Sequence, residues 1–224
     1  MSRATGNTNN TGAHHATGGT EAESTGTIRT DLRRIRDWIE PQSHLLDLAC
    51  GDGTLLALLS ETKNTTGYGM EISQPDIQTC LEKGLNVIHR DIELGLEIFE
   101  DRSFDYVLTT HSIQTLRYPA HTLLEMVRVG VRGIVSFPNM GFWTNRLSIG
   151  LLGRMPRTRS LPHEWHNTPN THLCTLRDFE NLCEELNIDI LRRAAVSNTH
   201  DKSPASTILP NLFSETALYE ITAK

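Results

Sequence analysis

From about residue 29 onward, short apolar runs alternate with amphipathic segments, and this alternation limits the fold more than any other feature of the chain. The runs have the length of strands and lie at residues 45–49, 66–72, 85–89, 104–109 and 133–137. Segments with apolar residues at helical spacing lie between them, at 54–61, 73–84 and 120–129. Strands that alternate with helices predict a doubly wound α/β fold, in which helices cover both faces of a mostly parallel sheet.

Further elements flank this central series. Apolar residues at helical spacing precede the first run, and Pro41 ends that helix. A helix near residues 175–186 and two strands at 188–195 and 217–222 complete the chain. Capping boxes are predicted at two helix starts, Ser73 with Asp76 and Thr175 with Asp178.

Composition separates the two ends of the chain. Residues 1–27 contain seven Thr, five Gly and three Asn but none of Leu, Ile, Val, Phe, Trp or Tyr. Such a segment buries too little apolar area to offset the entropy of ordering, so we expect a disordered tail before one domain at 28–224.

Charge and cysteine usage exclude several classes of protein. A net charge of −6 argues against a broad basic surface for nucleic acid, and no apolar run approaches the length of a membrane span. The four cysteines (Cys50, Cys80, Cys174 and Cys183) form no CxxC pair. We therefore expect reduced thiols in a cytoplasmic protein rather than a disulfide framework or a zinc site.

A glycine-containing turn, Gly51-Asp52-Gly53, joins the strand at 45–49 to the following helix. Glycine suits a sharp turn whose backbone approaches a ligand closely, and ligands of open α/β sheets bind beside such turns. Glu71 ends the next strand, 20 residues after Gly51, where an acid accepts hydrogen bonds from a ribose diol. Together these features predict a nucleotide-type ligand.

The loop departs from two common nucleotide patterns. Leu56 occupies the position of the third glycine in the dinucleotide pattern, and no Lys-Ser/Thr pair follows as a phosphate loop requires. Asp47 lies at the end of the strand itself, where an acid is a poor neighbour for pyrophosphate. It suits a ligand with a positive centre.

The segment Asp47–Gly53 resembles motif I of the class I S-adenosylmethionine (SAM)-dependent methyltransferases, acid-x-Gly-x-Gly-x-Gly, with Ala49 in place of the first glycine. We expect Ala49 to be accommodated there with a negative φ. The resemblance implies the Rossmann-like fold of that superfamily and a site for SAM or S-adenosylhomocysteine, with Glu71 at the ribose and Asp91 at the adenine. The residues that it implies for cofactor binding are Asp47, Ala49, Gly51, Gly53, Glu71, Asp91 and Ile92.

Longer blocks resemble the MetW family of methionine-biosynthesis proteins. They lie at residues 67–72, 84–89, 133–143 and 165–175, and include Phe137-Pro138-Asn139 and Asn167-Thr168-Pro169-Asn170. This resemblance implies a bacterial cytoplasmic protein that supports homoserine O-acyltransferase by direct contact. SAM, the downstream product, is a plausible feedback ligand under this hypothesis.

Methyl transfer to a small molecule is the alternative function. The segment Thr109–Gln114, at the end of a strand, lacks the Asn/Asp-Pro-Pro-aromatic motif with which amino methyltransferases orient a planar nitrogen. His111 is the candidate base there, although a histidine that merely lines the cofactor pocket is the simpler interpretation.

Two later segments admit more than one role. His163, Glu164, His166 and His172 lie in a Pro- and Asn-rich loop without HExxH spacing, so we expect no metal. We expect a loop over the pocket instead, with Trp165 as an apolar contact and Asn167 and Asn170 bonding backbone, as a substrate lid or a partner surface.

The other segment, residues 140–162, carries four arginines and no acid: Arg146, Arg154, Arg157 and Arg159. Trp143, Leu147 and Leu151 are spaced to form one stripe of a helix. This helix either packs its stripe on the sheet or serves as an appendage that docks the acyltransferase or captures an anionic substrate.

Overall fold

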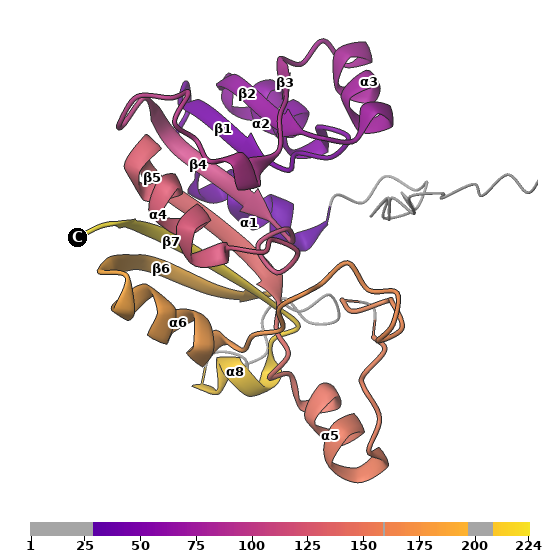
Figure 1. The fold of residues 1–224 in the computed structure, drawn as a ribbon. Helices are drawn as coiled ribbons and strands as arrows, with labels where there is room; N and C mark the ends of the chain where they lie inside the picture. The colour runs from indigo at the N-terminus through magenta and orange to yellow at the C-terminus, as the bar shows by residue number, and fades with distance from the viewer. Residues whose placement is uncertain (1–28, 159, 197–207) are drawn as a thin grey trace, which may run out of the picture.

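The computed structural model describes residues 29–158, 160–196 and 208–224, so the predicted tail and Arg159 lie outside the described residues. The strands of the described part form one seven-stranded sheet with the order β3-β2-β1-β4-β5-β7-β6 (Figure 1). Neighbours among β1 to β5 pair in parallel, whereas β7 is antiparallel to both β5 and β6. The strands are β1 (His44–Leu48), β2 (Thr66–Glu71), β3 (Val87–His89), β4 (Phe104–Thr110), β5 (Gly130–Pro138), β6 (Ile188–Val196) and β7 (Thr216–Ala223).

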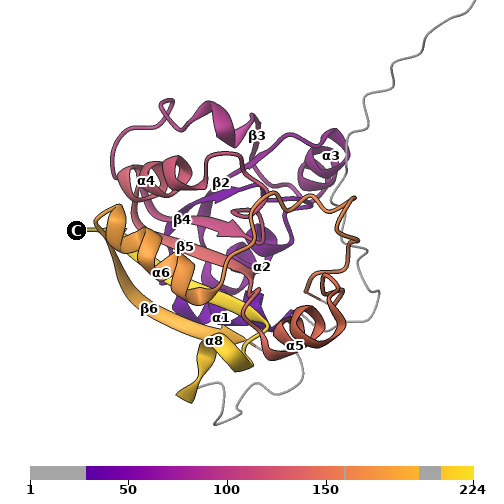
Figure 2. The same ribbon diagram turned by 60° about the horizontal axis from the view of Figure 1, so that its bottom comes forward.

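Helices cover both faces of this sheet, as the alternating pattern predicts. The helices are α1 (Thr30–Trp38), α2 (Thr54–Lys63), α3 (Gln74–Glu82), η1 (Ile92–Leu94), α4 (Pro119–Val129), α5 (Trp143–Leu152), α6 (Leu176–Glu185) and α8 (Pro210–Phe213). Successive residues of β1 face opposite sides: Leu45 belongs to a core with α1 and α2, and Leu46 to a core with α4 and α6 (Figure 2). The doubly wound α/β prediction is confirmed. In the described part of the chain, no helix has the length and apolarity to cross a bilayer.

One of the two predicted capping boxes is present. At the start of α6, the Thr175 side chain and Asp178 bond each other's main-chain N–H groups, as predicted. At the start of α3, the Ser73 side chain makes no capping bond, so that prediction is wrong. The physical reason is a competing acceptor: the Ser73 N–H donates to Glu71 Oε1 at 2.9 Å, in the place that Asp76 would take in a box.

Helix α5 confirms the predicted helical segment, and of the two arrangements expected for it the structure contradicts packing of the stripe on the sheet. Asn145 is the one buried residue among the ten positions of α5, all of them described. Two residues along a helix turn the side chain through about 200°, so Leu147 lies on the side opposite to Asn145. The stripe of Trp143, Leu147 and Leu151 therefore faces away from the protein, and Figure 1 shows α5 projecting from the end of the sheet.

Asn139, just after β5, connects the segments at this end of the molecule. Its side chain is buried; Nδ2 donates to the carbonyls of Asn211 at 3.1 Å and Ser214 at 2.8 Å. Its Oδ1 accepts the Gly141 N–H at 2.9 Å, and its own carbonyl accepts Asn145 Nδ2 at 3.1 Å. One asparagine thus holds both α8 and the start of α5 to the end of the sheet.

We predict that Asn139→Ala lowers the free energy of unfolding by about 3 kcal/mol, because it leaves buried carbonyl and N–H groups without partners. Urea denaturation measures the change. Asn86→Ala is the matched control, since Asn86 is exposed and makes one side-chain bond of 3.4 Å; a loss of at most about 0.5 kcal/mol is expected there. Equal stability of the two variants would contradict the role assigned to Asn139.

Candidate functional site

The loop after β1 turns through three residues with positive φ: Ala49 at +53°, Gly51 at +54° and Gly53 at +74°. The expectation of a negative φ at Ala49 is wrong. A side chain in this left-handed region costs roughly 1–2 kcal/mol, and such strain is concentrated at functional sites. The Cys50 N–H holds the turn against β2 by donating to the Met70 carbonyl at 3.1 Å.

The two glycines of the loop have different surroundings. A Cβ on Gly53 would lie 2.4 Å from Leu85 Cδ1 and 2.9 Å from Cys80 Sγ, so those side chains would have to shift, and the φ of +74° also favours glycine there. A Cβ on Gly51 would meet no protein atom within 4 Å. Open space beside a left-handed glycine at the end of a central strand is where the backbone of this fold class approaches a ligand.

Asp47 is the unusual group of the site. It is 1% exposed, and neither of its carboxylate oxygens has a hydrogen-bond partner among the described residues. Burial, with a contribution from the nearby charge of Glu71, raises the pKa of Asp47 to about 8. A buried acid without partners marks a place where a positively charged group would gain a strong interaction.

Glu71, at the end of β2, closes the loop. Its Oε2 accepts the Gly51 N–H at 2.9 Å, and its Oε1 accepts the N–H groups of Ile72 at 2.8 Å and Ser73 at 2.9 Å. A carboxylate accepts about four hydrogen bonds, so capacity for a hydroxyl donor is left. The structure thus brings Asp47, Gly51 and Glu71 together, as the spacing in the sequence led us to expect.

Asp91 and Ile92 follow β3 at the same carboxyl edge of the sheet. Asp91 is exposed, and its Oδ1 accepts the Glu93 N–H at 2.9 Å to begin η1. Ile92 is buried in the core that contains Met70, so its side chain has a packing role. Asp91 follows β3 next to the end of β2 that carries Glu71, and in the part of the chain that the structure describes its side chain makes no hydrogen bond with the glycine loop.

His111 lies just beyond β4, whose residue Thr109 pairs with Leu48 of β1, so it neighbours the glycine loop. Its φ is +59°, and its main-chain N–H donates to the Ser136 carbonyl at 2.8 Å. Its Nε2 lies 3.1 Å from Asp31 Oδ2, a partner from α1 that the sequence reasoning missed. An acid in the first turn of a helix is ordinarily a favourable charge for the helix dipole, so no sequence signal pointed to it.

Asp31 is itself buried and also bonds the Arg29 guanidinium. Burial alone would raise its pKa, but the hydrogen bond with His111 and the charge of Arg29 hold the pKa of Asp31 well below its usual range. A carboxylate that orients an imidazole is the arrangement of a general base or a fixed hydrogen-bonding group.

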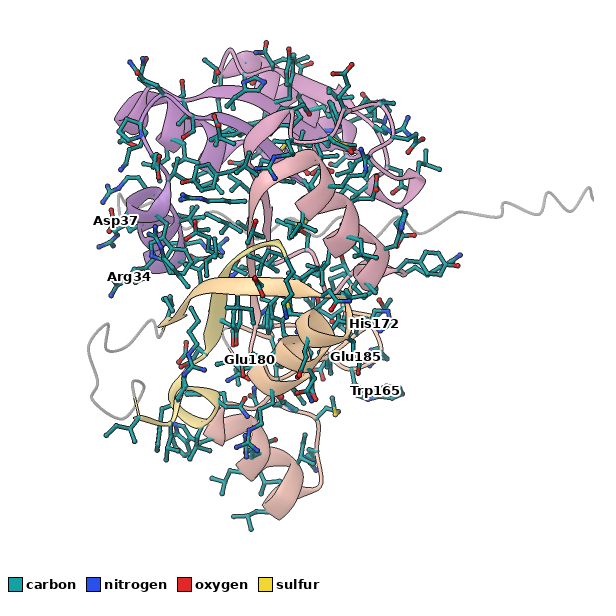
Figure 3. All side chains as sticks on the ribbon, turned by 90° about the vertical axis from the view of Figure 1, so that its left-hand side faces the viewer. Arg34, Asp37, Trp165, His172, Glu180 and Glu185 are labelled. Carbon is teal, nitrogen blue, oxygen red and sulfur yellow. The ribbon has the colours of Figure 1, made fainter. Side chains whose placement is uncertain are left out.

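The loop at residues 163–174 is attached beside this strand end. The N–H groups of Thr171 and His172 both donate to the Gln114 carbonyl at 3.0 Å, and Gln114 Nε2 donates to the Pro138 carbonyl at 3.1 Å. Trp165 is 74% exposed at the periphery (Figure 3), so its expected apolar contact stays a prediction for a bound substrate or partner. Asn167 and Asn170 bond through their main-chain N–H groups.

All four cysteines are free thiols, and burial is the main cause that raises the pKa of Cys174 to about 11 and of Cys183 to about 12. Within residues 29–158, 160–196 and 208–224, no three His, Cys, Asp or Glu side chains gather as metal ligands would.

We predict that Asp47→Asn stabilises the ligand-free protein at pH 7.5 by about 2–4 kcal/mol. The native pKa of about 8 lies above the ordinary value of 3.8, so native stability falls as the pH rises from about 4 to 8, when the unfolded chain ionises first. The asparagine variant escapes this loss, and its advantage disappears near pH 4. Urea denaturation at both pH values tests the prediction.

The exposed Asp91→Asn serves as the control for Asp47→Asn. Its stability should differ from that of the wild type by at most about 0.5 kcal/mol at either pH. An Asp47→Asn variant that is less stable than the wild type at pH 7.5 would show that Asp47 is ionised and paired in the native state.

Solved structures with the same fold include SAM-dependent methyltransferases. One from Mesorhizobium loti has a TM-score of 0.62 at 14% identity, covering 84% of this chain and 95% of its own. One from Thermotoga maritima, described as a possible histamine N-methyltransferase, has a TM-score of 0.61 at 14% identity, covering 86% of this chain and 87% of its own. At this identity the likeness establishes the Rossmann-like methyltransferase fold.

Sequence comparison identifies the family. The bifunctional methionine biosynthesis protein MetXA/MetW of Rhodopirellula baltica is 34% identical over 173 residues, which are 73% of this chain and 28% of that protein. This chain thus spans little more than a quarter of the relative's length. The family profile described as methionine biosynthesis protein MetW matches residues 29–221. The chain belongs to the MetW family of methionine biosynthesis proteins.

Proposed function

We propose that this chain binds SAM at the loop after β1 and acts with a homoserine O-acyltransferase in methionine biosynthesis. The observation that carries the SAM assignment is the unpartnered carboxylate of Asp47 beside the open space at Gly51. SAM carries an ammonium and a sulfonium, and a cation suits a buried acid without partners better than pyrophosphate does. Glu71 would hold the ribose diol, and Asp91 the adenine amino group.

The partner assignment is supported by the relative from Rhodopirellula baltica. Its printed name joins MetXA and MetW in one polypeptide. The region of that polypeptide that matches this chain makes up 28% of its length. We take the MetXA part to be the acyltransferase that activates homoserine. Proteins that are fused in one species commonly act together. Because SAM is the downstream product, SAM binding to this chain would signal to that enzyme how much product has accumulated.

Methyl transfer is the second candidate function, and one observation favours it. His111 is oriented by Asp31 at 3.1 Å, at the strand end beside the glycine loop. SAM, when bound, supplies an activated methyl group; His111 could then accept a proton from an acceptor that is held in line.

We predict that SAM binds the wild-type protein and that Gly51→Ala weakens the affinity by about tenfold or more, because the added methyl group enters the open space of the loop. Isothermal titration calorimetry measures the affinity. Gly153→Ala is a matched control: Gly153 has a φ of +60°, and its Cβ would also meet nothing within 4 Å, but it lies at the end of α5. Both variants should lose about 1 kcal/mol of stability.

Binding at pH 7 should also release a proton from Asp47, because a bound cation favours the ionised carboxyl. The binding enthalpy should then change between phosphate and Tris buffers in proportion to their ionisation enthalpies. Failure of SAM and S-adenosylhomocysteine to bind the wild type would refute the cofactor assignment.

We further predict that the chain co-purifies with the acyltransferase of the same genome and that SAM changes the rate of acyl transfer by about fivefold or more in the mixture. Gly51→Ala should shift this response to SAM concentrations about tenfold higher or more. His111→Ala should preserve it, because an accessory role needs no base.

The same mixture distinguishes the two functions when labelled SAM and a metabolite extract are added. Methylated product that accumulates with the wild type and is lost with His111→Ala would establish methyl transfer as the function. Labelled SAM that remains intact while acyl transfer responds supports the accessory role.

A further inference from the structure

Helix α5 presents an apolar surface to solvent. The α5 stripe, defined as Trp143, Leu147 and Leu151, is 45%, 48% and 75% exposed, respectively. It lies opposite to Asn145, through which the helix is attached to Asn139. Figure 1 shows α5 standing apart from the helices that cover the sheet. A set of large apolar side chains turned away from the core marks a site of protein association.

The apolar surface continues past the end of the helix. Leu152 and Met155 are 70% and 48% exposed, and Gly153 ends α5 in the left-handed conformation. The chain then reverses: the main-chain N–H of Arg154 donates to the Ser148 carbonyl at 3.3 Å, and Ser148 Oγ donates back to the Arg154 carbonyl at 3.0 Å. These bonds keep the segment folded against the end of its own helix.

Positive charge surrounds this surface. Residues 140–162 contain no acidic residue. Arg157 forms an ion pair with Glu164, which lies outside that stretch, with 2.8 Å between Nη1 and Oε1. Arg154 has no acidic partner within ion-pair distance among the described residues. Arginine supplies both long-range attraction and bidentate bonds to carboxylates, so the rim of this surface suits an acidic partner.

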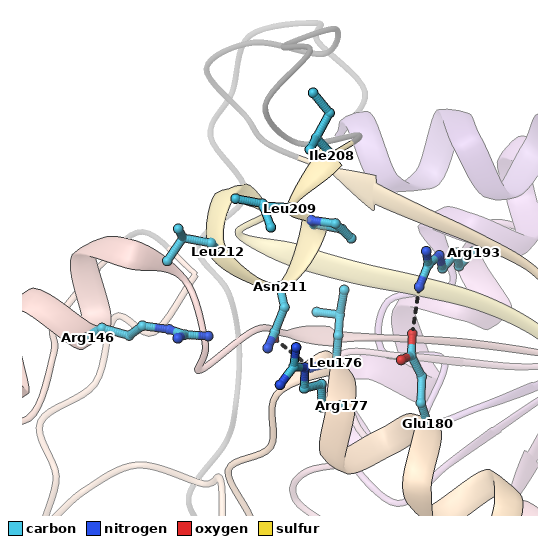
Figure 4. Close-up of a pocket in the computed structure, with 10 residues that line it drawn as sticks. Arg146, Leu176, Arg177, Glu180, Arg193, Ile208, Leu209, Asn211 and Leu212 are labelled. Carbon is cyan, nitrogen blue, oxygen red and sulfur yellow. Dashed lines mark hydrogen bonds and ion pairs between the residues drawn. The ribbon is translucent and has the colours of Figure 1, made fainter.

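A cavity of about 360 Å³ adjoins the base of α5, between α6 and α8 (Figure 4). Arg146 reaches its wall from α5, where its Nε also donates to the Gly141 carbonyl at 2.6 Å. Arg177 and Arg193 complete a set of three guanidinium groups, of which Arg193 is paired with Glu180 at 3.1 Å. The cavity therefore extends the cationic rim from α5 onto the body of the protein.

We propose that the α5 stripe, rimmed by Arg146 and Arg154, docks the homoserine O-acyltransferase by entering an apolar groove bordered by Asp and Glu. This inference rests on the function proposed above, and it names the surface through which that function operates. The relative that joins MetXA and MetW in one polypeptide supports a lasting association, and lasting interfaces are the more apolar class.

The charge pattern favours this occupant over a second copy of the chain. An isologous contact through α5 would bring Arg146 and Arg154 of one copy against the same residues of the other. Like charges across an interface oppose association, whereas a groove bordered by carboxylates turns each arginine into an attractive contact.

The test measures binding of the purified acyltransferase to the immobilised full chain by surface plasmon resonance. Leu147→Ser combined with Leu151→Ser should raise Kd by about tenfold or more, mainly through faster dissociation. Leu81→Ser combined with Leu191→Ser is the matched control, because both leucines are exposed on other elements; its Kd should match that of the wild type. Arg154→Glu should slow association most strongly at low salt.

The outcomes separate failure of this surface from failure of the proposed function. If the wild type does not bind the acyltransferase, the proposed function falls and the inference with it. If the wild type binds and the Leu147/Leu151 variant binds equally well, the proposed function stands and only the assignment of docking to the α5 stripe is wrong. Thermal unfolding of the variant should match that of the wild type, because the substituted leucines are exposed.

Two further measurements address other occupants of the same surface. Light scattering of the chain alone would overturn the inference if the wild type were a dimer and the Leu147/Leu151 variant a monomer. Co-sedimentation with vesicles of phosphatidylcholine and phosphatidylglycerol would overturn it if the wild type bound and the variant did not. A monomer that ignores vesicles and loses the acyltransferase on substitution is the expected result.

Discussion

Two buried carboxylates on neighbouring strands, Asp47 and Glu71, meet at the carboxyl end of the sheet, and the candidate site depends on how each is accommodated. Three main-chain N–H groups replace water around Glu71, and one of them belongs to Gly51, so the acid also shapes the loop. Asp47 receives no such bonds. We therefore expect Asp47 to weaken the ligand-free fold, and under the proposed SAM assignment a bound cation would offset that cost, the usual conflict between stability and binding.

The blocks that most resemble the MetW family serve structural roles at the carboxyl edge of the sheet, beside the glycine loop. In Phe137-Pro138-Asn139, the phenylalanine packs in the core while Asn139 holds α5 and α8. In the loop at 165–175, Thr171 and His172 bond Gln114 through their backbones, and Thr175 caps α6. These residues position an appendage and a loop at the edge where the glycine turn also lies.

The strands, most helices and the Asp47-Gly51-Glu71 group were predictable because each rests on local periodicity or on spacing along two adjacent strands. The direction of α5 was not, since periodicity shows that Trp143, Leu147 and Leu151 share a face but not whether that face is buried. The missing bond at Ser73 reflects competition from the Glu71 carboxylate within the site, and the pairing of His111 with Asp31 joins residues that are 80 positions apart in the sequence. The φ of +53° at Ala49 reflects strain that composition does not reveal.

Feedback from a SAM site to a docked enzyme requires an element that ligand and partner both bias. Gln114, three residues after His111, donates to the carbonyl of Pro138, and the next residue, Asn139, holds α5 through Asn145. Any displacement at the carboxyl end of β4 therefore acts on a short series of hydrogen bonds that ends at α5. Because α5 buries one of its ten described residues, it can shift with little loss of core packing. A partner docked on the exposed stripe would then favour whichever position of α5 it binds better.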